Sequence, residues 1–260
     1  MNQAFWIDTH AHVTHGKFRD NQEQILTNAR DASIKTIISA ATCAADALAV
    51  VELAHREPLV KAAVGIHPND THLLQPGDWD RILKLATDPV VVAIGETGLD
   101  RYWKDAPFDV QQESFVKHLE LAEKLGLPVV IHCRDAMTDI LNLLEQRNRP
   151  LRGTMHCFIG SLEDSKRLLE LGLHLGIGGI STFANKEFDA LRDVIREIPQ
   201  DRLLVETDAP FLSPHPFRGK MNEPSRVAVT GQALAELKGW SVEECARITT
   251  ENAESLFRRI

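Results

Sequence analysis

The sequence predicts an α/β protein folded as a single-domain (β/α)8 TIM barrel. The chain has 260 residues, a length that suits one large α/β barrel or two smaller domains. Eight short apolar runs alternate with longer segments of helical character, and the runs are nearly continuous in apolar residues. Such runs are typical of parallel strands that are covered on both faces. We therefore expect one barrel domain over residues 1–260, with an open doubly wound sheet as the alternative fold.

The eight predicted strands are short apolar runs bounded by turn residues. Neighbouring parallel strands need a crossover that is long enough to hold a helix, and every pair of consecutive runs has such a connection. Eight units of this kind favour a closed barrel over an open sheet. The predicted strands cover residues 5–9, 36–41, 61–66, 90–95, 128–132, 153–156, 174–178 and 202–206.

Local signals delimit several of the predicted helices. Asp109 with Gln112, and Ser161 with Asp164, have the spacing of a capping box at a helix start. Gly126 follows a helical run where a left-handed glycine commonly ends a helix. We expect helices at residues 21–32, 44–56, 79–87, 109–125, 136–147, 162–171 and 187–197, with a final pair at 226–238 and 242–257.

Composition and charge bound the class of protein. Hydrophobic residues make up 43% of the chain and charged residues 25%, as in ordinary soluble domains. The formal net charge of −8 argues against a broad basic surface for nucleic acid, but not against an enzyme that meets phosphates through bound cations. The N-terminus lacks the basic and apolar regions of a signal peptide, and no apolar run approaches membrane-spanning length. The four cysteines show no disulfide spacing. We expect a cytoplasmic protein with no membrane association and no obligate protein partner.

Ionisable side chains stand at the ends of several predicted strands. The run Val129–Val130–Ile131 ends at His132, and the carboxyl ends of barrel strands carry the chemistry in this fold. His10 and His12 lie two residues apart, so on a strand they face the same way and can chelate one cation. Each residue alone has an ordinary structural explanation, but their recurrence at one end of the barrel favours metal binding. The predicted metal ligands are His10, His12, Glu96, His132, His156 and Asp208.

The charge of this set suits hydrolysis with two divalent cations. The ions would bring four positive charges, of which Glu96 and Asp208 offset two. The remainder suits a phosphodiester anion together with a metal-bound hydroxide, because metal binding lowers the pKa of water to about 7. Asp208 could accept the proton of that water as the catalytic base. The mixed nitrogen and oxygen ligands leave the ion open among Mg, Mn and Zn.

Two further residues at strand ends are candidates for substrate binding. His67 follows the third predicted strand and could touch a substrate, although a histidine in a turn before proline explains it equally well. Arg134 follows His132 and could clamp a phosphate or carboxylate with two hydrogen bonds, although an ion pair with a neighbouring acid is the simpler account. The long proline-rich loop over residues 209–225 is expected to be a functional segment of the barrel rim.

With these residues in view, the chain resembles the TatD family of metal-dependent hydrolases, within the amidohydrolase-like barrels. The resemblance extends over essentially the full length, through residues 8–12, 65–68, 95–100, 132–135, 156–158, 206–210, 218–220 and 222–224. It implies one metal held by His10, His12, Glu96 and Asp208, and a second held by Glu96, His132 and His156. It further implies Asp208 as the base that activates water, and His67, Arg134 and Asn222 near the substrate.

The resemblance also implies an activity. Members of the family are described as metal-dependent deoxyribonucleases, including 3′→5′ exonucleases, so DNA is the expected substrate. Hydrolysis of another ester or amide, such as an aminoacyl ester on tRNA, is the alternative among enzymes, and a catalytically silent metal-binding or partner-binding barrel is the alternative of another class. Phe217 and Met221 stand where relatives often carry histidine and a basic residue, so the sequence departs from the family in the substrate loop rather than in the ligand set.

Overall fold

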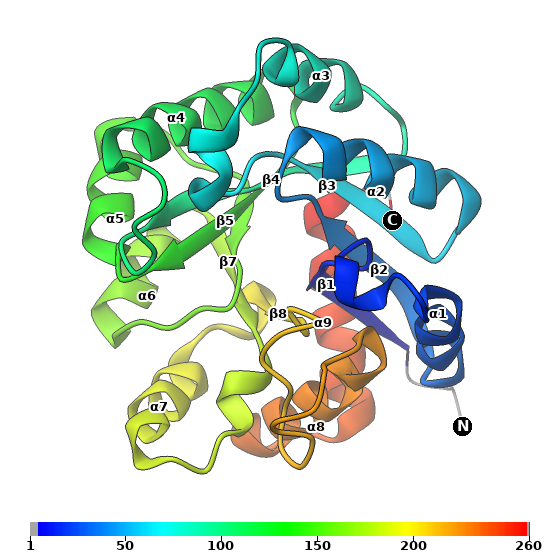
Figure 1. Cartoon of the computed structure of the whole chain (residues 1–260). Helices are drawn as coiled ribbons and strands as arrows, with labels where there is room; N and C mark the ends of the chain where they lie inside the picture. Colours follow the sequence, from blue (N-terminus) through cyan, green and yellow to red (C-terminus); the bar gives the residue numbers. More distant parts are fainter. Residues whose placement is uncertain (1–4, 259) are drawn as a thin grey trace.

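A computed structural model, which describes residues 5–258 and 260, has the predicted (β/α)8 barrel architecture. Figure 1 looks into the barrel, with the strands at the centre and the helices arranged around them. Residues 1–4, which carry part of the argument against a signal peptide, lie outside the described residues. No helix within the described range is both long and apolar enough to cross a membrane.

The eight strands follow one another around the barrel in sequence order, and all neighbours are parallel. The barrel closes through a parallel bridge between Ala11 and Ala209, where the His12 amide donates to the Ala209 carbonyl at 2.7 Å. An open sheet is therefore excluded. The strands are β1 (Trp6–Ala11), β2 (Ile34–Ala40), β3 (Val60–Val64), β4 (Val91–Asp100), β5 (Val129–Arg134), β6 (Gly153–Met155), β7 (Leu173–Ile177) and β8 (Leu203–Val205).

The helices lie within two residues of the predicted bounds. Ser161 begins α6 with the predicted capping box, and Gly126 ends α4 in the left-handed conformation. The predicted capping box of Asp109 and Gln112 is wrong, because α4 starts one residue earlier and Pro107 occupies the cap without a side-chain bond. The helices are α1 (Gln22–Asp31), α2 (Ala44–Arg56), α3 (Asp78–Leu85), α4 (Phe108–Leu125), α5 (Met137–Gln146), α6 (Leu162–Glu170), α7 (Asp189–Glu197), α8 (Val227–Lys238) and α9 (Val242–Phe257).

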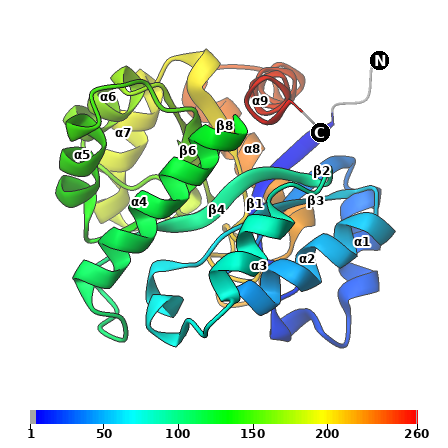
Figure 2. The ribbon, with the colours of Figure 1, turned by 90° about the horizontal axis from the view of Figure 1, so that it is seen from above.

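Helix α9 closes the end of the barrel opposite the carboxyl ends of the strands. It lies behind the strands in Figure 1 and at the upper end of the barrel in Figure 2. Its side chains Leu256 and Phe257 are buried against a small apolar cluster that fills the barrel interior. Because this end is plugged, chemistry is confined to the opposite mouth. The strand residues of the cluster are Ile7, Ile38, Ala40, Ala63, Val92, Ala93, Val130 and Leu204.

Strand β4 continues to Asp100, five residues beyond its predicted end. The extension depends on Gly98, whose φ is +150° and whose backbone lies against β5. A Cβ atom built on Gly98 would stand 2.0 Å from the carbonyl oxygen of His132, so only glycine fits there. The close approach of the two strands brings Glu96 and Asp100 of β4 beside His132 of β5.

His118 is a buried histidine that packs α4 onto the barrel. Its Nε2 accepts a hydrogen bond from the Ile66 amide at 3.0 Å, and its Nδ1 lies 2.7 Å from the Ser114 carbonyl. Burial lowers the pKa of His118 to about 4, whereas a histidine in an unfolded chain titrates near 6.5. The unfolded state therefore takes up this proton first, and the free energy of unfolding falls as the pH decreases from about 6.5 to 4.

We expect His118→Gln to remove this pH dependence. Chemical unfolding at several pH values should show that the wild-type protein loses about 3 kcal/mol more than the variant between pH 6.5 and 4. Parallel stability curves for the two proteins would contradict the assignment of this titration to His118.

Candidate metal centre

The six predicted ligands meet in one cavity at the carboxyl ends of the strands. They come from β1, β4, β5, and the segments that directly follow β6 and β8. The cavity has a volume of about 470 Å³, and five of the six residues line it. The other, His10, is completely buried beneath the cavity, with its Nε2 directed at Glu96. Residues almost 200 positions apart in the sequence are therefore brought together, as the sequence predicts.

Glu96 is the centre of the cluster, and its two carboxylate oxygens face two separate pairs of histidines. Oε2 lies 3.3 Å from Nε2 of His10 and 3.5 Å from Nε2 of His12. Oε1 lies 2.8 Å from both Nδ1 of His132 and Nε2 of His156. Asp208 completes the first group, with Oδ1 at 3.7 Å from His10 and 3.4 Å from His12. One carboxylate is thus positioned to bridge two cations.

Hydrogen bonds outside the cluster fix which nitrogen of His12 and of His132 faces it. Nδ1 of His12 lies 2.9 Å from the Ala40 carbonyl, which can only accept, so this nitrogen carries the proton. Nε2 of His132 lies 3.0 Å from Oδ2 of Asp100 and donates to that carboxylate. In the neutral rings, Nε2 of His12 and Nδ1 of His132 therefore turn lone pairs toward Glu96. Lone pairs that converge in this way need a positive charge between them, which either a proton or a metal ion can supply.

The carboxylates of the centre are ionised and favour positive charge on their partners. Burial raises the pKa of Glu96, but the attraction of His156 and His10 outweighs it and the pKa lies well below its usual value. Burial lowers the pKa of His12, but the hydrogen bond with Asp208 and the charge of Glu96 have a larger, opposite effect. The pKa of His12 is therefore raised to about 9. The pKa of His156 is likewise raised well above its usual value: burial opposes the shift and the charge of Glu96 outweighs it. The cavity is thus electrostatically suited to cations.

The donor set fits divalent metal ions on three grounds. Two ligand atoms that are each about 2.1 Å from one cation lie roughly 3–3.4 Å apart, and the nitrogen–oxygen separations here are 2.8–3.7 Å. Oε2 of Glu96 is buried and accepts no hydrogen bond from the described residues. Imidazole and carboxylate together suit Zn, Mn and related ions. Compact donor groups occur at His10, Glu96 and His156, and at His10, His12 and Asp208.

Two buried carboxylates deeper in the barrel hold the cluster in place. Oδ2 of Asp8 accepts from the Thr207 hydroxyl at 2.6 Å and Oδ1 from the Thr207 amide at 2.9 Å, which fixes the segment that carries Asp208. Glu206 accepts a hydrogen bond from the Cys157 amide, and its Oε1 lies 3.6 Å from Nδ1 of His156. The sequence signal for Glu206 is its position two residues before Asp208, which places it one layer deeper on the same face.

Asp100 should control the metal affinity of the centre through His132. Its pKa is lowered to about 2: burial opposes the shift, and the hydrogen bond from His132 outweighs it. We expect Asp100→Asn to weaken the binding of Mn²⁺ or Zn²⁺ about 10–100-fold in calorimetric titrations, because the amide no longer fixes the proton on Nε2 of His132. Asp139→Asn is the matched control, since Asp139 pairs with Arg101 and with no histidine. Equal metal affinities for the two variants would contradict this role.

His67 and Arg134, the two candidates for substrate binding at strand ends, both line the cavity. Nδ1 of His67 accepts from the Asn69 amide at 3.1 Å, so the ring proton is on Nε2, which lies 3.7 Å from Oε1 of Glu96. Burial and the nearby His132 lower the pKa of His67 to about 3, so it is a neutral hydrogen-bond donor. The Arg134 guanidinium stacks on the Tyr102 ring at 3.7 Å.

Asn222, predicted to lie near the substrate, is not brought to the cavity with His67 and Arg134. Asn222 is 0% exposed and does not line the cavity. Its amide hydrogens are used within the rim loop, where Nδ2 donates to the carbonyls of Thr207 at 2.8 Å and Phe211 at 2.7 Å. Asn222 therefore holds the rim loop against the segment of Asp208 instead of offering its side chain to a ligand.

The cysteines contribute no nucleophile to the centre. Cys43, Cys133, Cys157 and Cys245 are unpaired. Burial raises the pKa of the Cys133 thiol to about 12 and that of the Cys157 thiol well above its usual value. Both thiols are therefore protonated at neutral pH, and both side chains are half-buried and pack against the core.

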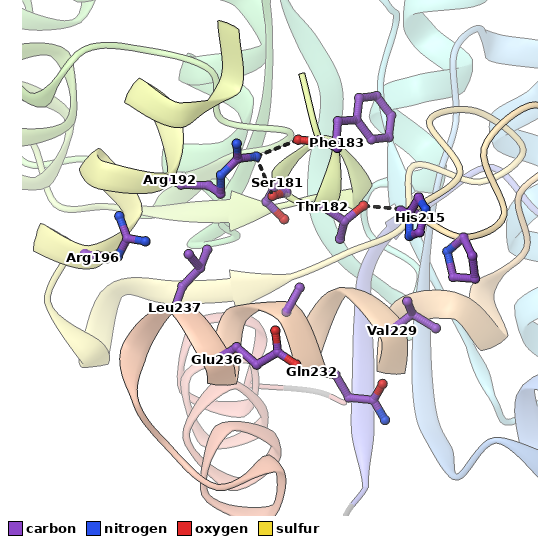
Figure 3. Close-up of a pocket in the computed structure, with 13 residues that line it drawn as sticks. Ser181, Thr182, Phe183, Arg192, Arg196, His215, Val229, Gln232, Glu236 and Leu237 are labelled. Atoms are coloured by element: carbon purple, nitrogen blue, oxygen red, sulfur yellow. Dashed lines mark hydrogen bonds between the residues drawn. The ribbon is translucent and has the colours of Figure 1, made fainter. Parts of the chain in front are cut away.

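A second, larger cavity of about 640 Å³ lies between α7, α8 and the rim loop, and it shares no residue with the metal centre (Figure 3). Arg192 points toward it but is occupied by the Phe183 carbonyl at 2.6 Å and by Asp189. Arg196 pairs with Asp193. The described residues of this cavity bring together no group of metal ligands, so the chemistry belongs to the smaller cavity.

Comparison with known proteins agrees with this geometry. The model of the TatD related DNase family matches residues 7–258. An uncharacterized metal-dependent hydrolase of Bacillus subtilis, YabD, is 40% identical over 97% of this chain and 98% of its own length. An uncharacterized metal-dependent hydrolase of Escherichia coli, YcfH, is 38% identical over 97% of this chain and 96% of its own length. The crystal structure of the TatD homolog YjjV from E. coli superposes with a TM-score of 0.90 at 33% identity, covering 97% and 98%. The chain therefore belongs to the TatD-related family and is a metal-dependent hydrolase.

Proposed function

We propose that this hydrolase cleaves phosphodiester bonds of DNA, as a 3′→5′ exonuclease, with two divalent cations held by the six clustered side chains. The observation that carries the proposal is the Glu96 carboxylate, whose oxygens face one histidine pair each. The description of the matching family supports DNA as the substrate class. When bound, the two cations supply Lewis acidity at the phosphate and acidify the attacking water.

The protein's own side chains accept the proton of the attacking water and bind the phosphates of the substrate. Asp208 is directed into the cavity, and its pKa is lowered, since the hydrogen bond with His12 and the nearby histidines outweigh the effect of burial. It is therefore ionised at neutral pH and accepts the proton of the attacking water. His67 donates a hydrogen bond to a phosphate oxygen through Nε2, and Arg134 pairs with a flanking phosphate at the mouth of the cavity.

We include the cellular setting in the proposal. The four cysteines are free thiols, which supports a reducing compartment such as the cytoplasm. The whole chain, residues 1–260, would act as one catalytic domain.

A single-turnover assay tests the proposed activity. Single-stranded DNA labelled at its 5′ end should be shortened from its 3′ end by the protein with Mg²⁺ or Mn²⁺, and addition of EDTA should stop the reaction. An aminoacyl ester serves as the competing substrate. Turnover of the ester without cleavage of the DNA would exclude the nuclease and leave a metal-dependent esterase.

A further inference from the structure

Exposed aromatic side chains gather at the mouth of the metal centre. Within the described residues, four aromatic side chains are exposed: Phe5, Tyr102, Trp103 and Phe211. Trp103, 50% exposed, and Phe211, 39% exposed, both line the cavity of the metal centre. Tyr102 adjoins Trp103, with 5.0 Å between the ring centroids. Large aromatic groups are normally buried in part, so three at one mouth indicate a ligand with flat apolar faces.

Each of these aromatic surfaces has a cation beside it. The Arg134 guanidinium lies 3.7 Å from the Tyr102 ring and 5.8 Å from the Trp103 ring. The Lys17 ammonium lies 4.8 Å from the Phe211 ring. A surface that combines a ring with a cation matches a nucleotide, which presents a planar base next to an anionic phosphate.

The two aromatic platforms stand on opposite sides of the barrel. Trp103 follows β4 and Phe211 follows β8, and these strands are four positions apart in the ring of eight. Both platforms are tied to the metal centre through the backbone. The Trp103 amide donates to Oδ1 of Asp100 at 2.9 Å, and the Phe211 amide donates to the Asp208 carbonyl at 2.8 Å. Both rings line the cavity that holds Glu96 and Asp208, so a substrate in that cavity can meet one ring on the β4 side and one on the β8 side.

We propose that Trp103 and Phe211 stack on nucleobases on the two sides of the scissile phosphodiester, while Arg134 and Lys17 bind the flanking phosphates. This inference rests on the proposed cleavage of DNA and adds the residues that select single-stranded over double-stranded DNA. Stacking on both rings requires bases that are free of their complementary strand, so these subsites accept a single-stranded end. Because every base has a flat face, they are tolerant of sequence.

Binding of an oligonucleotide tests the stacking directly. The probe is single-stranded oligodeoxythymidylate with Mn²⁺, and Asp208→Asn serves as the background so that turnover is slow. Base stacking should quench the fluorescence of Trp103, and the Trp103→Phe variant should lose that quenching while it still binds the probe. Trp103→Ala and Phe211→Ala should each raise the Kd about 5–150-fold, as expected for the loss of one stacked base. Phe5→Ala is the matched control, because Phe5 is an exposed aromatic residue at the start of β1, remote from the mouth.

Cleavage assays without the Asp208→Asn substitution distinguish the proposed nuclease activity from the proposed stacking subsites. Trp103→Ala and Phe211→Ala should raise the KM for the oligonucleotide more than they lower kcat, and Trp103→Phe should restore most of the loss. If the wild-type enzyme cleaves the probe and both alanine variants match Phe5→Ala in Kd and KM, the stacking subsites are refuted while the nuclease stands. If the wild-type enzyme neither binds nor cleaves the probe, both the nuclease and the subsites are refuted.

Discussion

Glu96→Gln should reduce kcat/KM by about four orders of magnitude or more, because one carboxylate serves both histidine pairs. Its oxygens lie 2.8–3.5 Å from four imidazole nitrogens, and an amide would replace one of these acceptors by a hydrogen-bond donor. Metal catalysis supplies several kcal/mol of transition-state stabilisation, and each 1.36 kcal/mol corresponds to a factor of ten in rate. The loss of both ions should therefore remove most of the catalysis.

Metal analysis of the purified protein checks this result together with the assay. We expect two divalent ions per wild-type chain and a marked loss from Glu96→Gln. Glu145→Gln is the matched control, since Glu145 pairs with Arg167 on the outside of the barrel. A Glu96→Gln protein that retains both ions and full activity would show that the carboxylate is no bridge.

Asp208→Asn should lower kcat by about 10²–10⁴-fold, the usual contribution of a general base, and leave KM within a few-fold of the wild type. The asparagine side chain can still coordinate a cation through its oxygen, but it cannot take up a proton at neutral pH. The rate should be measured at saturating Mn²⁺, with the bound metal determined in parallel, so that loss of the base is distinguished from loss of the ion.

Asp201→Asn is the control for this experiment, because Asp201 is an exposed aspartate at the opposite end of β8. An unchanged kcat in the variant would remove Asp208 from the mechanism.

The fold was largely predictable, because short apolar runs and amphipathic segments alternate without exception. The main error concerns β4, whose glycines at positions 95 and 98 resemble a turn in the sequence. In the structure, Gly98 allows the strand to continue beside β5, where any side chain would meet the His132 carbonyl. Glycines occur both where a strand ends in a turn and where two backbones approach closely. The second case depends on tertiary packing, so the sequence alone does not distinguish the two.

The convergence of the six candidate ligands was predictable for a related reason. Strand ends in a parallel barrel share one mouth, so a histidine or carboxylate at each of several strand ends needs no further information to be placed there. The burial or exposure of side chains in the loops around the mouth was not predictable in the same way. Asn222 lies in a loop that was expected to meet the substrate, but its amide satisfies two carbonyls within the loop. The exposed rings of Trp103 and Phe211 carried no sequence signal, because loop aromatics are buried or exposed according to their neighbours.

The contact between β1 and the segment that follows β8 has a consequence for the order of events during translation. The Thr207 amide bonds to Asp8 across 199 residues, and this contact sets the position of Asp208. At about 5–20 residues per second, the ribosome delivers the later partner roughly 10–40 s after the earlier one. Throughout that interval His10 and His12 lack the aspartate that completes their group, so we expect this group to bind a cation only after the barrel has closed.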